Sequence, residues 1–284
     1  MSGIGLIGVG FVGKLFVDKL READYTLTVY DVDKTQVDYA TARGATAVES
    51  PATVAERSES VILALPGRCE VEAVMESKDG LLDAATPGQL IIDTTTTGPE
   101  IAVEYEQQCA DQDVGFISAP LTRNAPGGIH MMVGGSEQHY RNAVEVLDCL
   151  SAAHKRIGEI GDGQTFKLML QLRYAGHRAI DAEIVAFGRD NGVDPGLLSS
   201  FLGLDLWEKY LHDDFEQDIE GMGGRRIWQK DIGYALDVAR RNDTALPLSS
   251  DVYEAYKATA RSAGPDEGHA AAIIQYWQHL NGRD

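Results

Sequence analysis

Short apolar runs alternate with segments of helical spacing from residue 3 to about residue 160. The runs are Ile4–Ile7, Leu27–Tyr30, Val61–Leu65, Leu90–Ile92, Phe116–Ile117 and Met131–Val133, and turn-forming Gly, Pro or Asp residues separate them. Continuous apolar runs are typical of strands buried on both faces, and their alternation with helices is typical of parallel βαβ units. The pattern predicts a doubly wound α/β domain over residues 1–161.

The pattern changes at Gly161-Asp162-Gly163. Beyond this point the apolar positions have helical spacing, which predicts an all-helical second domain over residues 162–284. Residues 165–191 contain no proline and end before Gly192, so they predict one joining helix of about 27 residues, roughly 40 Å long. This helix is apolar around most of its circumference, so we expect it to be buried between domains or between subunits.

The charge balance excludes two classes of partner. The chain has 44 acidic and 25 basic residues, a net charge of −19. A surface this negative repels phosphate backbones and anionic lipid, so we expect no nucleic-acid or membrane partner. The excess of acid is typical either of an ordinary acidic enzyme or of a halophilic protein from a salt-rich cytoplasm.

Cysteine and histidine positions give no support to a disulfide framework or a metal centre. Cys69, Cys109 and Cys149 form no CxxC pair, which favours free thiols in a reducing, cytoplasmic compartment. Residues 1–13 lack the basic start and the cleavage site of a signal peptide, so they are interpreted as a first strand. The seven histidines have no ligand-type spacing. We therefore predict no catalytic metal.

A glycine motif directly follows the first predicted strand. It is Gly8-Val9-Gly10-Phe11-Val12-Gly13, and a helical segment begins after it. GxGxxG alone is a weak signal, but between a strand and a helix it is typical of a Rossmann-like dinucleotide site. There Gly8 makes the tight turn, Gly10 lets the backbone approach a diphosphate and Gly13 lets the helix pack closely on the strand.

An acidic residue ends the second predicted strand at the expected distance. Asp31 lies 18 residues after Gly13, close to the separation of the acid that binds the adenine ribose diol. Asp33 adds a second negative charge, and neither Arg nor Lys precedes Lys34 in this turn. We therefore expect NAD rather than NADP as the cofactor. The alternative is that Asp31 is only a turn residue.

Two later turns also follow predicted strands. They are Leu65-Pro66-Gly67 and the segment Asp93–Pro99, which includes Thr96. Ligands of doubly wound sheets bind beyond the carboxyl ends of the strands, so these turns can line the nicotinamide side of a cleft. They can equally be ordinary turns that end strands.

A polar triplet, Thr122-Arg123-Asn124, follows a further apolar run. A hydroxyl, a guanidinium and an amide in succession form a plausible anion-binding loop, because Arg pairs bidentately with carboxylate or sulfonate. The alternative, an ordinary surface salt bridge of Arg123, is equally compatible with the spacing.

Four polar or aromatic residues share one face of the long predicted helix. Lys167, Gln171, Tyr174 and Arg178 follow each other at intervals of four, three and four residues. Hydride transfer at a hydroxyl-bearing carbon needs a group that moves the hydroxyl proton, and a lysine can serve. Gln171, one turn later, would orient that lysine or the substrate oxygen. Lysines at helix starts are more often solvated.

Lys230-Asp231 begins another helical segment and either reaches toward the cofactor or pairs locally.

In their order and spacing these residues resemble the β-hydroxyacid dehydrogenase family. The resemblance is carried by GLIGVGFVG at 5–13, VYDVD at 29–33, DTTTTGPE at 93–100, APLTRN at 119–124, GDGQTFKLMLQ at 161–171 and KD at 230–231. It implies a Rossmann-like domain joined by a long helix to an all-helical domain, and a homodimer or homotetramer.

The resemblance also implies roles for single residues. Lys167 would be the catalytic acid/base, and Thr122, Arg123 and Asn124 would hold the acid group of a small 3-hydroxy acid or semialdehyde. Leu65, Pro66 and Thr96 would contact the cofactor, and Lys230 would close over it. With Arg at position 123, this loop resembles that of the branch of the family that acts on a sulfonate. Gly268–Ala271 would form part of the pocket wall.

Two other functions are compatible with the same cofactor motif. One is an imine reductase on the same fold, and the other is a nicotinamide-binding sensor without turnover. Imine reductases often lack the lysine, so Lys167 favours the dehydrogenase over both alternatives.

Overall fold

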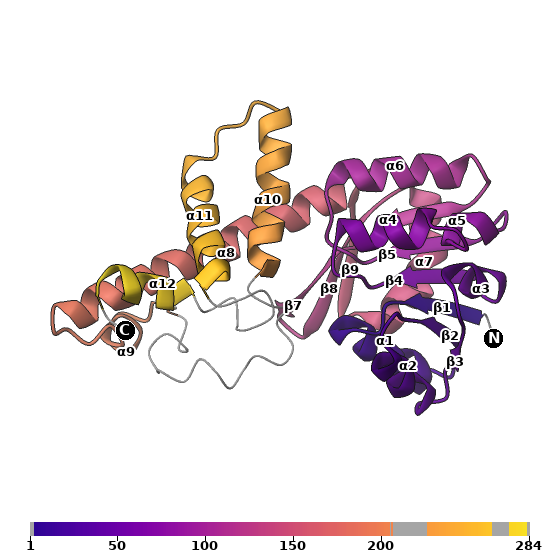
Figure 1. Ribbon diagram of the computed structural model, residues 1–284, viewed down its shortest axis with the longest axis horizontal. Coiled ribbons are helices and arrows are strands. Elements are labelled where there is room, and N and C mark those ends of the chain that lie inside the picture. The colour runs from indigo at the N-terminus through magenta and orange to yellow at the C-terminus, as the bar shows by residue number, and fades with distance from the viewer. Residues whose placement is uncertain (1–2, 205, 207–225, 263–272, 283–284) are drawn as a thin grey trace. The chain divides into compact units, whose positions relative to one another are not determined.

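The computed structural model describes residues 3–204, 206, 226–262 and 273–282 (Figure 1). The chain divides into two compact units, Met1–Lys167 and Leu168–Asp284. The predicted pocket wall at Gly268–Ala271 lies outside the described residues.

The first unit is built on a nine-stranded sheet in the order β3-β2-β1-β4-β5-β6-β8-β7, with β9 beside β8. The strands are β1 Gly3–Ile7, β2 Thr26–Tyr30, β3 Thr46–Ala47, β4 Ser60–Leu63, β5 Leu90–Asp93, β6 Gly115–Ser118, β7 Leu121–Ala125, β8 Gly128–Gly134 and β9 Ala153–Gly158. Neighbours pair in parallel except β6 with β8 and β7 with β8. All the predicted strands are present, and the apolar pattern missed β3, β7 and β9.

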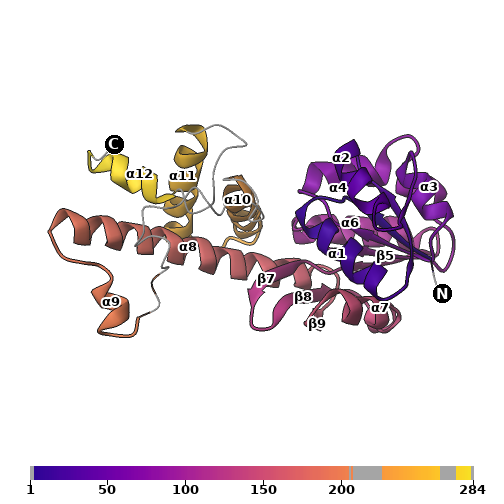
Figure 2. The same cartoon turned by 90° about the horizontal axis from the view of Figure 1, so that it is seen from below.

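Helices cover both faces of this sheet (Figure 2). They are α1 Phe11–Glu22, α2 Lys34–Thr41, α3 Pro51–Glu56, α4 Arg68–Glu76, α5 Leu81–Ala84, α6 Pro99–Ala110 and α7 Glu137–Leu150. Within β1, Leu6 packs with the core under α1 and α7, whereas the next residue, Ile7, packs with the core under α3, α4 and α6. Successive side chains of a strand point to opposite faces. This arrangement confirms the predicted doubly wound fold.

The second unit is helical in its described part. Its helices are α8 Asp162–Asp190, which begins in the first unit, α9 Leu197–Ser200, α10 Arg226–Arg241, α11 Pro247–Ser262 and α12 Ile273–Leu280. Small and apolar residues of α8, such as Ala175 and Ala182, pack against Ile232 of α10 and Tyr256 of α11. The predicted long helix is confirmed. No helix among the described residues is long and apolar enough to cross a membrane.

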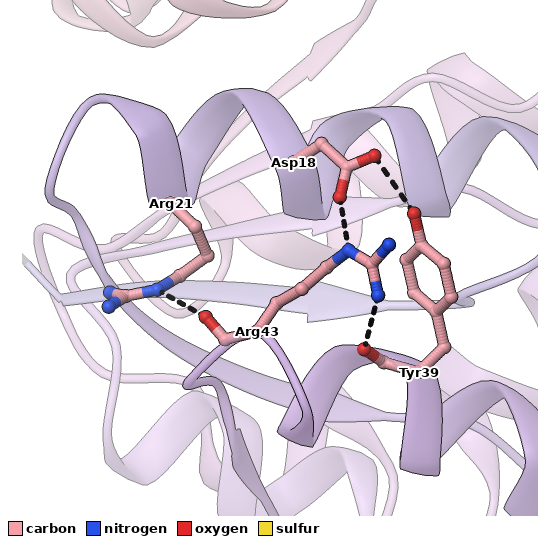
Figure 3. Close-up of polar contacts among 4 residues, drawn as sticks. All are labelled: Asp18, Arg21, Tyr39 and Arg43. Atoms are coloured by element: carbon pink, nitrogen blue, oxygen red, sulfur yellow. Dashed lines mark hydrogen bonds and ion pairs between the residues drawn. The ribbon is translucent and has the colours of Figure 1, made fainter.

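A cluster of polar side chains fastens α1 to α2 (Figure 3). The carboxylate of Asp18 accepts from Arg43 Nε at 2.6 Å and from the Tyr39 hydroxyl at 2.8 Å. The Arg43 guanidinium also lies 3.5 Å from the centre of the Tyr39 ring, and Arg21 Nε donates to the Arg43 carbonyl at 3.0 Å. These contacts fix the position of α2 against α1. They therefore also fix the turn between β2 and α2.

The three cysteines are free thiols, as the sequence predicted. Cys69 is exposed and Cys109 is buried in the core beneath α6. Burial, together with the nearby charge of Glu106, raises the pKa of Cys109 to about 12. Because only the thiolate is reactive, Cys109 is an inert packing residue at neutral pH.

Candidate active site

The glycine motif forms the turn between β1 and α1. Gly8 has a φ of +91°, which favours glycine, and a Cβ there would overlap the Ala64 carbonyl oxygen. A Cβ at Gly13 would overlap the Gly8 carbonyl oxygen, so this glycine permits the close approach of helix and strand. A Cβ at Gly10 would meet nothing within 4 Å. The backbone beside Gly10 and the first amides of α1 are therefore open to a ligand from outside the protein.

Asp31 is bonded to the glycine motif itself. Its Oδ2 accepts from the Val9 backbone N–H at 2.6 Å, and its Oδ1 accepts from the Asp33 N–H at 2.8 Å. The carboxylate thus ties the end of β2 to the turn after β1, a role that the sequence spacing did not reveal. A carboxylate oxygen has two lone pairs, so each oxygen keeps one for a further donor such as a ribose hydroxyl.

The charges around Asp33 differ from those that the sequence alone suggested. The Thr35 N–H caps α2 on the Asp33 carboxylate at 2.8 Å and, more than any other contact, holds the pKa of Asp33 below its usual value. The charge of Lys14 acts in the same direction, and its Nζ lies 5.0 Å from the centre of the Tyr39 ring. The sequence predicted no cation in the turn after β2 because only residues adjacent in sequence were considered. In the fold, Lys14 of α1 lies near this turn.

The turns after β4 and β5 are joined to each other. Leu65 N–H donates to Thr95 Oγ1 at 3.2 Å, and Thr94 Oγ1 donates to the Leu63 carbonyl at 2.7 Å. Because β4 and β5 are parallel neighbours, the predicted cofactor residues Leu65, Pro66 and Thr96 lie on adjacent turns at one edge of the sheet. This is the edge where ligands of such sheets bind.

Gln164, in the first turn of α8, holds this edge together. The side chain is fully buried. Its Nε2 donates to the Thr95 carbonyl and to Ser118 Oγ, both at 2.8 Å, and its Oε1 accepts from the Thr97 N–H at 3.0 Å. Thr96 therefore lies between two residues that Gln164 fixes. The role of Gln164 was not predicted from the sequence, where the available signal was a polar residue at the start of a mostly apolar helix.

The predicted anion-binding residues lie on β7, close to the glycine motif. The Arg123 guanidinium carbon lies 4.0 Å from the centre of the Phe11 ring, and Phe11 is the first residue of α1. Partial burial lowers the pKa of Arg123 from its high ordinary value, but an arginine keeps its charge. Thr122 is buried, and Asn124 follows on the same strand. The fold thus brings Arg123 and Phe11 together although they are distant in sequence.

The predicted catalytic residues, Lys167 as acid/base and Gln171 as the residue that orients it, lie on α8. Lys167 and Gln171 are each only 7% exposed, so Lys167 is not the solvated lysine of the alternative interpretation. In the second unit, Gln171 Nε2 donates to Asp231 Oδ2 at 2.5 Å, and Lys230 Nζ lies 3.0 Å from Asp231 Oδ1. Asp231 is buried and was not among the predicted site residues, although the sequence placed it beside Lys230.

Metal-binding groups of three or more His, Cys, Asp or Glu side chains are absent from the described part of the chain. Besides the carboxylates of Asp31 and Asp93, which already accept backbone N–H groups, the polar atoms at the sheet edge are backbone amides, hydroxyls and amide side chains. Such groups bind phosphate and ribose rather than a transition metal. The residues present fit a dinucleotide.

Comparisons with known proteins give the same picture. Residues 3–161 match the family model described as the NAD binding domain of 6-phosphogluconate dehydrogenase. Residues 161–276 match the one described as NAD-binding of NADP-dependent 3-hydroxyisobutyrate dehydrogenase. The mitochondrial 3-hydroxyisobutyrate dehydrogenase of Mus musculus is 26% identical, over 96% of this chain and 86% of its own. The L-threonate dehydrogenase of Cupriavidus necator is 28% identical, over 95% of both chains.

Solved structures share the fold. The 3-hydroxyisobutyrate dehydrogenase of Mycobacterium tuberculosis, solved with L-serine, has a TM-score of 0.83 at 23% identity, over 97% of this chain and 98% of its own. An imine reductase from Myxococcus stipitatus has a TM-score of 0.66 at 15% identity, over 97% of this chain and 99% of its own. At these identities the likeness shows the fold alone.

The fold, the dinucleotide turn and the family matches together define a nicotinamide-dependent oxidoreductase. The chain belongs to the β-hydroxyacid dehydrogenase family, and it is an NAD(P)-dependent dehydrogenase or reductase of that family.

Proposed function

We propose that the enzyme transfers hydride between nicotinamide and a small 3-hydroxy acid, or the matching semialdehyde, whose acid group is a carboxylate or a sulfonate. The observation that carries this proposal is the position of Arg123, whose guanidinium lies over Phe11 at the start of α1. An anion held there would lie beside the turn that binds the cofactor. The dehydrogenases named among the relatives act on hydroxy acids, which supports the same substrate class.

Each predicted residue has a role in this proposal. Residues 1–161 form the cofactor domain, and residues 162–284 form the domain for substrate binding and dimerisation. The cofactor residues are Gly8, Gly10, Phe11, Val12, Gly13, Asp31, Leu65, Pro66, Thr96 and Lys230. Thr122, Arg123 and Asn124 bind the acid group of the substrate.

Proton transfer is assigned to Lys167. When bound, nicotinamide accepts a hydride from the hydroxyl carbon or returns it to a carbonyl carbon. In oxidation the neutral Lys167 amine takes the hydroxyl proton as the C–O bond becomes a carbonyl, and in reduction the ammonium gives that proton back. Gln171, one helical turn later, positions the Lys167 side chain.

Removing the acid charge from the substrate tests the role of Arg123. The methyl ester of 3-hydroxyisobutyrate is expected to have a kcat/KM at least about 10²-fold below that of the acid, because it leaves the guanidinium without a charged partner. In Arg123→Gln this preference should largely disappear. Arg141→Gln, on an exposed arginine of α7, is the matched control and should keep it. Equal turnover of acid and ester by the wild-type enzyme would refute the anchor.

We further propose that NAD is preferred over NADP. Asp31 and Asp33 place two carboxylates at the end of β2, where the 2′-phosphate of NADP would be repelled. Fluorescence titration should give an NADPH dissociation constant at least ~10-fold above that of NADH. Asp33→Asn should narrow this ratio, whereas Asp38→Asn on the exposed face of α2 should leave it unchanged. Equal or tighter NADPH binding would show that Lys14 outweighs both carboxylates.

We propose, finally, that the enzyme is a homodimer or homotetramer that assembles through its helical part. The end of α8 and the segment that follows it expose Phe187 (71%), Phe201 (82%) and Leu202 (60%). Large exposed apolar patches mark interaction sites in soluble proteins. Light scattering should give a mass at least twice the 30.8 kDa of the chain, and Phe187→Glu should lower it. A monomer at micromolar concentration would contradict this proposal.

A further inference from the structure

The carboxylate of Asp231 is buried and lies beside an amide donor and a cation. Asp231, in α10, is only 1% exposed. Its Oδ2 accepts from Gln171 Nε2 at 2.5 Å, and its Oδ1 lies 3.0 Å from Lys230 Nζ. Burying a charge is costly unless it is paired and hydrogen-bonded. Oδ2 meets this requirement through its hydrogen bond, whereas Oδ1 has the charge of Lys230 beside it but no hydrogen-bond partner among the described residues. The bond to Gln171 connects α10 to the proposed acid/base helix, α8.

Asp231 also determines which way the Gln171 carboxamide is turned. An ionised carboxylate accepts hydrogen bonds and cannot donate them. The NH₂ group of Gln171 must therefore face Asp231, and its carbonyl oxygen Oε1 lies on the other edge of the amide. Lys167 lies one turn earlier on the same helix, at the spacing at which side chains meet. Its ammonium carries three donors and needs acceptors, because it is almost fully buried.

We propose that Asp231 is a positioning residue that keeps the Gln171 carbonyl oxygen available to the Lys167 side chain while its second oxygen holds Lys230. The inference rests on the proposed role of Lys167 in proton transfer. If the carboxamide were reversed, its N–H groups would face the ammonium donors, and Lys167 would lose an acceptor. One buried carboxylate would thus orient the acid/base group and the lysine proposed to approach the cofactor.

The variant Asp231→Asn tests this orientation with almost no change of shape. An asparagine offers both a donor and an acceptor, so the Gln171 carboxamide is no longer held in one orientation. We expect kcat to fall at least ~10-fold, with less than about a threefold change in KM. A fall in thermal stability with unchanged kcat per folded molecule would show a purely structural role and overturn the proposal.

A double variant reverses the polarity of the pair. In Gln171→Glu with Asp231→Asn, the amide introduced on α10 would donate to one oxygen of the carboxylate introduced on α8, and the other oxygen could still accept from Lys167. We expect this double variant to recover kcat to within about threefold of wild type, whereas Gln171→Glu alone places two carboxylates together and stays low. Recovery of thermal stability without recovery of kcat would contradict the positioning role.

A measurement that does not depend on catalytic turnover tests this inference independently of the proposed function. Lysines labelled with ¹³C-methyl groups can be titrated by NMR, and the Lys167→Arg variant identifies the Lys167 signal. We expect Asp231→Asn to lower the midpoint of that titration by about one pH unit, because a lost acceptor and a lost nearby negative charge both disfavour the charged form. The double variant, which places a carboxylate beside Lys167, should return the midpoint to the wild-type value or above it. An unchanged midpoint overturns the inference. Failure of every hydroxy acid to react would refute the proposed function and leave this result standing.

Discussion

Replacing Lys167 with alanine is expected to lower kcat at least ~10²-fold while leaving NADH affinity within a factor of about two. A positioned general acid/base contributes rate enhancement of this order. Lys167 is almost fully buried on α8, so the loss arises at a group that solvent cannot readily replace. Steady-state kinetics and a fluorescence titration of NADH measure the two quantities separately.

Two further variants make this first prediction specific. Lys167→Arg keeps a positive charge but cannot give up its proton near neutral pH, so it should be nearly as inactive as the alanine variant. Lys257→Ala removes a lysine that pairs with Glu254 at 2.9 Å on α11, and it should leave kcat unchanged. Undiminished turnover in Lys167→Ala would show that Lys167 is not the catalytic acid/base.

The second large effect is expected on stability, from Gln164→Leu. Leucine keeps much of the volume but makes none of the three hydrogen bonds to Thr95, Thr97 and Ser118. Each buried polar group left without a partner costs about 1–3 kcal/mol. We expect the free energy of unfolding to fall by about 2–5 kcal/mol in urea titrations. The KM for NAD should also rise, because the turn that carries Thr96 loses its support.

A second glutamine provides the control for Gln164. Gln107 on α6 is exposed and donates to Asp111 at 2.9 Å within its own helix. Gln107→Leu should change the free energy of unfolding by less than about 0.5 kcal/mol. A similarly small effect of Gln164→Leu would show that its buried hydrogen bonds do not stabilise the sheet edge.

The core of the fold was predictable because it follows from local patterns. Strands such as Leu90–Asp93 are buried on both faces and therefore read as continuous apolar runs. The missed strand β9, Ala153–Gly158, contains Lys155 and Arg156, and among the described strands it pairs with β8 alone. Strands β7 and β9 both lie beside β8, where one neighbour and partial exposure do not demand an apolar sequence.

The residue types of the site were also predictable, but several of the contacts that hold them were not. Phe11 and Arg123 were assigned separately, and only the fold places the guanidinium over the ring. Gln164 bonds to residues 67 and 69 positions earlier, and Gln171 to a residue 60 positions later. Pairings at such separations depend on topology rather than on any local period. The same limit explains why the charge of Lys14 near Asp33 was overlooked.

Following NADH formation at 340 nm tests the central claim most directly. The enzyme is incubated with NAD and, in turn, 3-hydroxyisobutyrate, glycerate, serine, 4-hydroxybutyrate and dihydroxypropanesulfonate, in low and high salt. We predict turnover of at least one 3-hydroxy acid or of the sulfonate, abolished by Lys167→Ala. NADH binding without turnover of any of these compounds would contradict the proposed function and favour an imine reductase or a nicotinamide sensor.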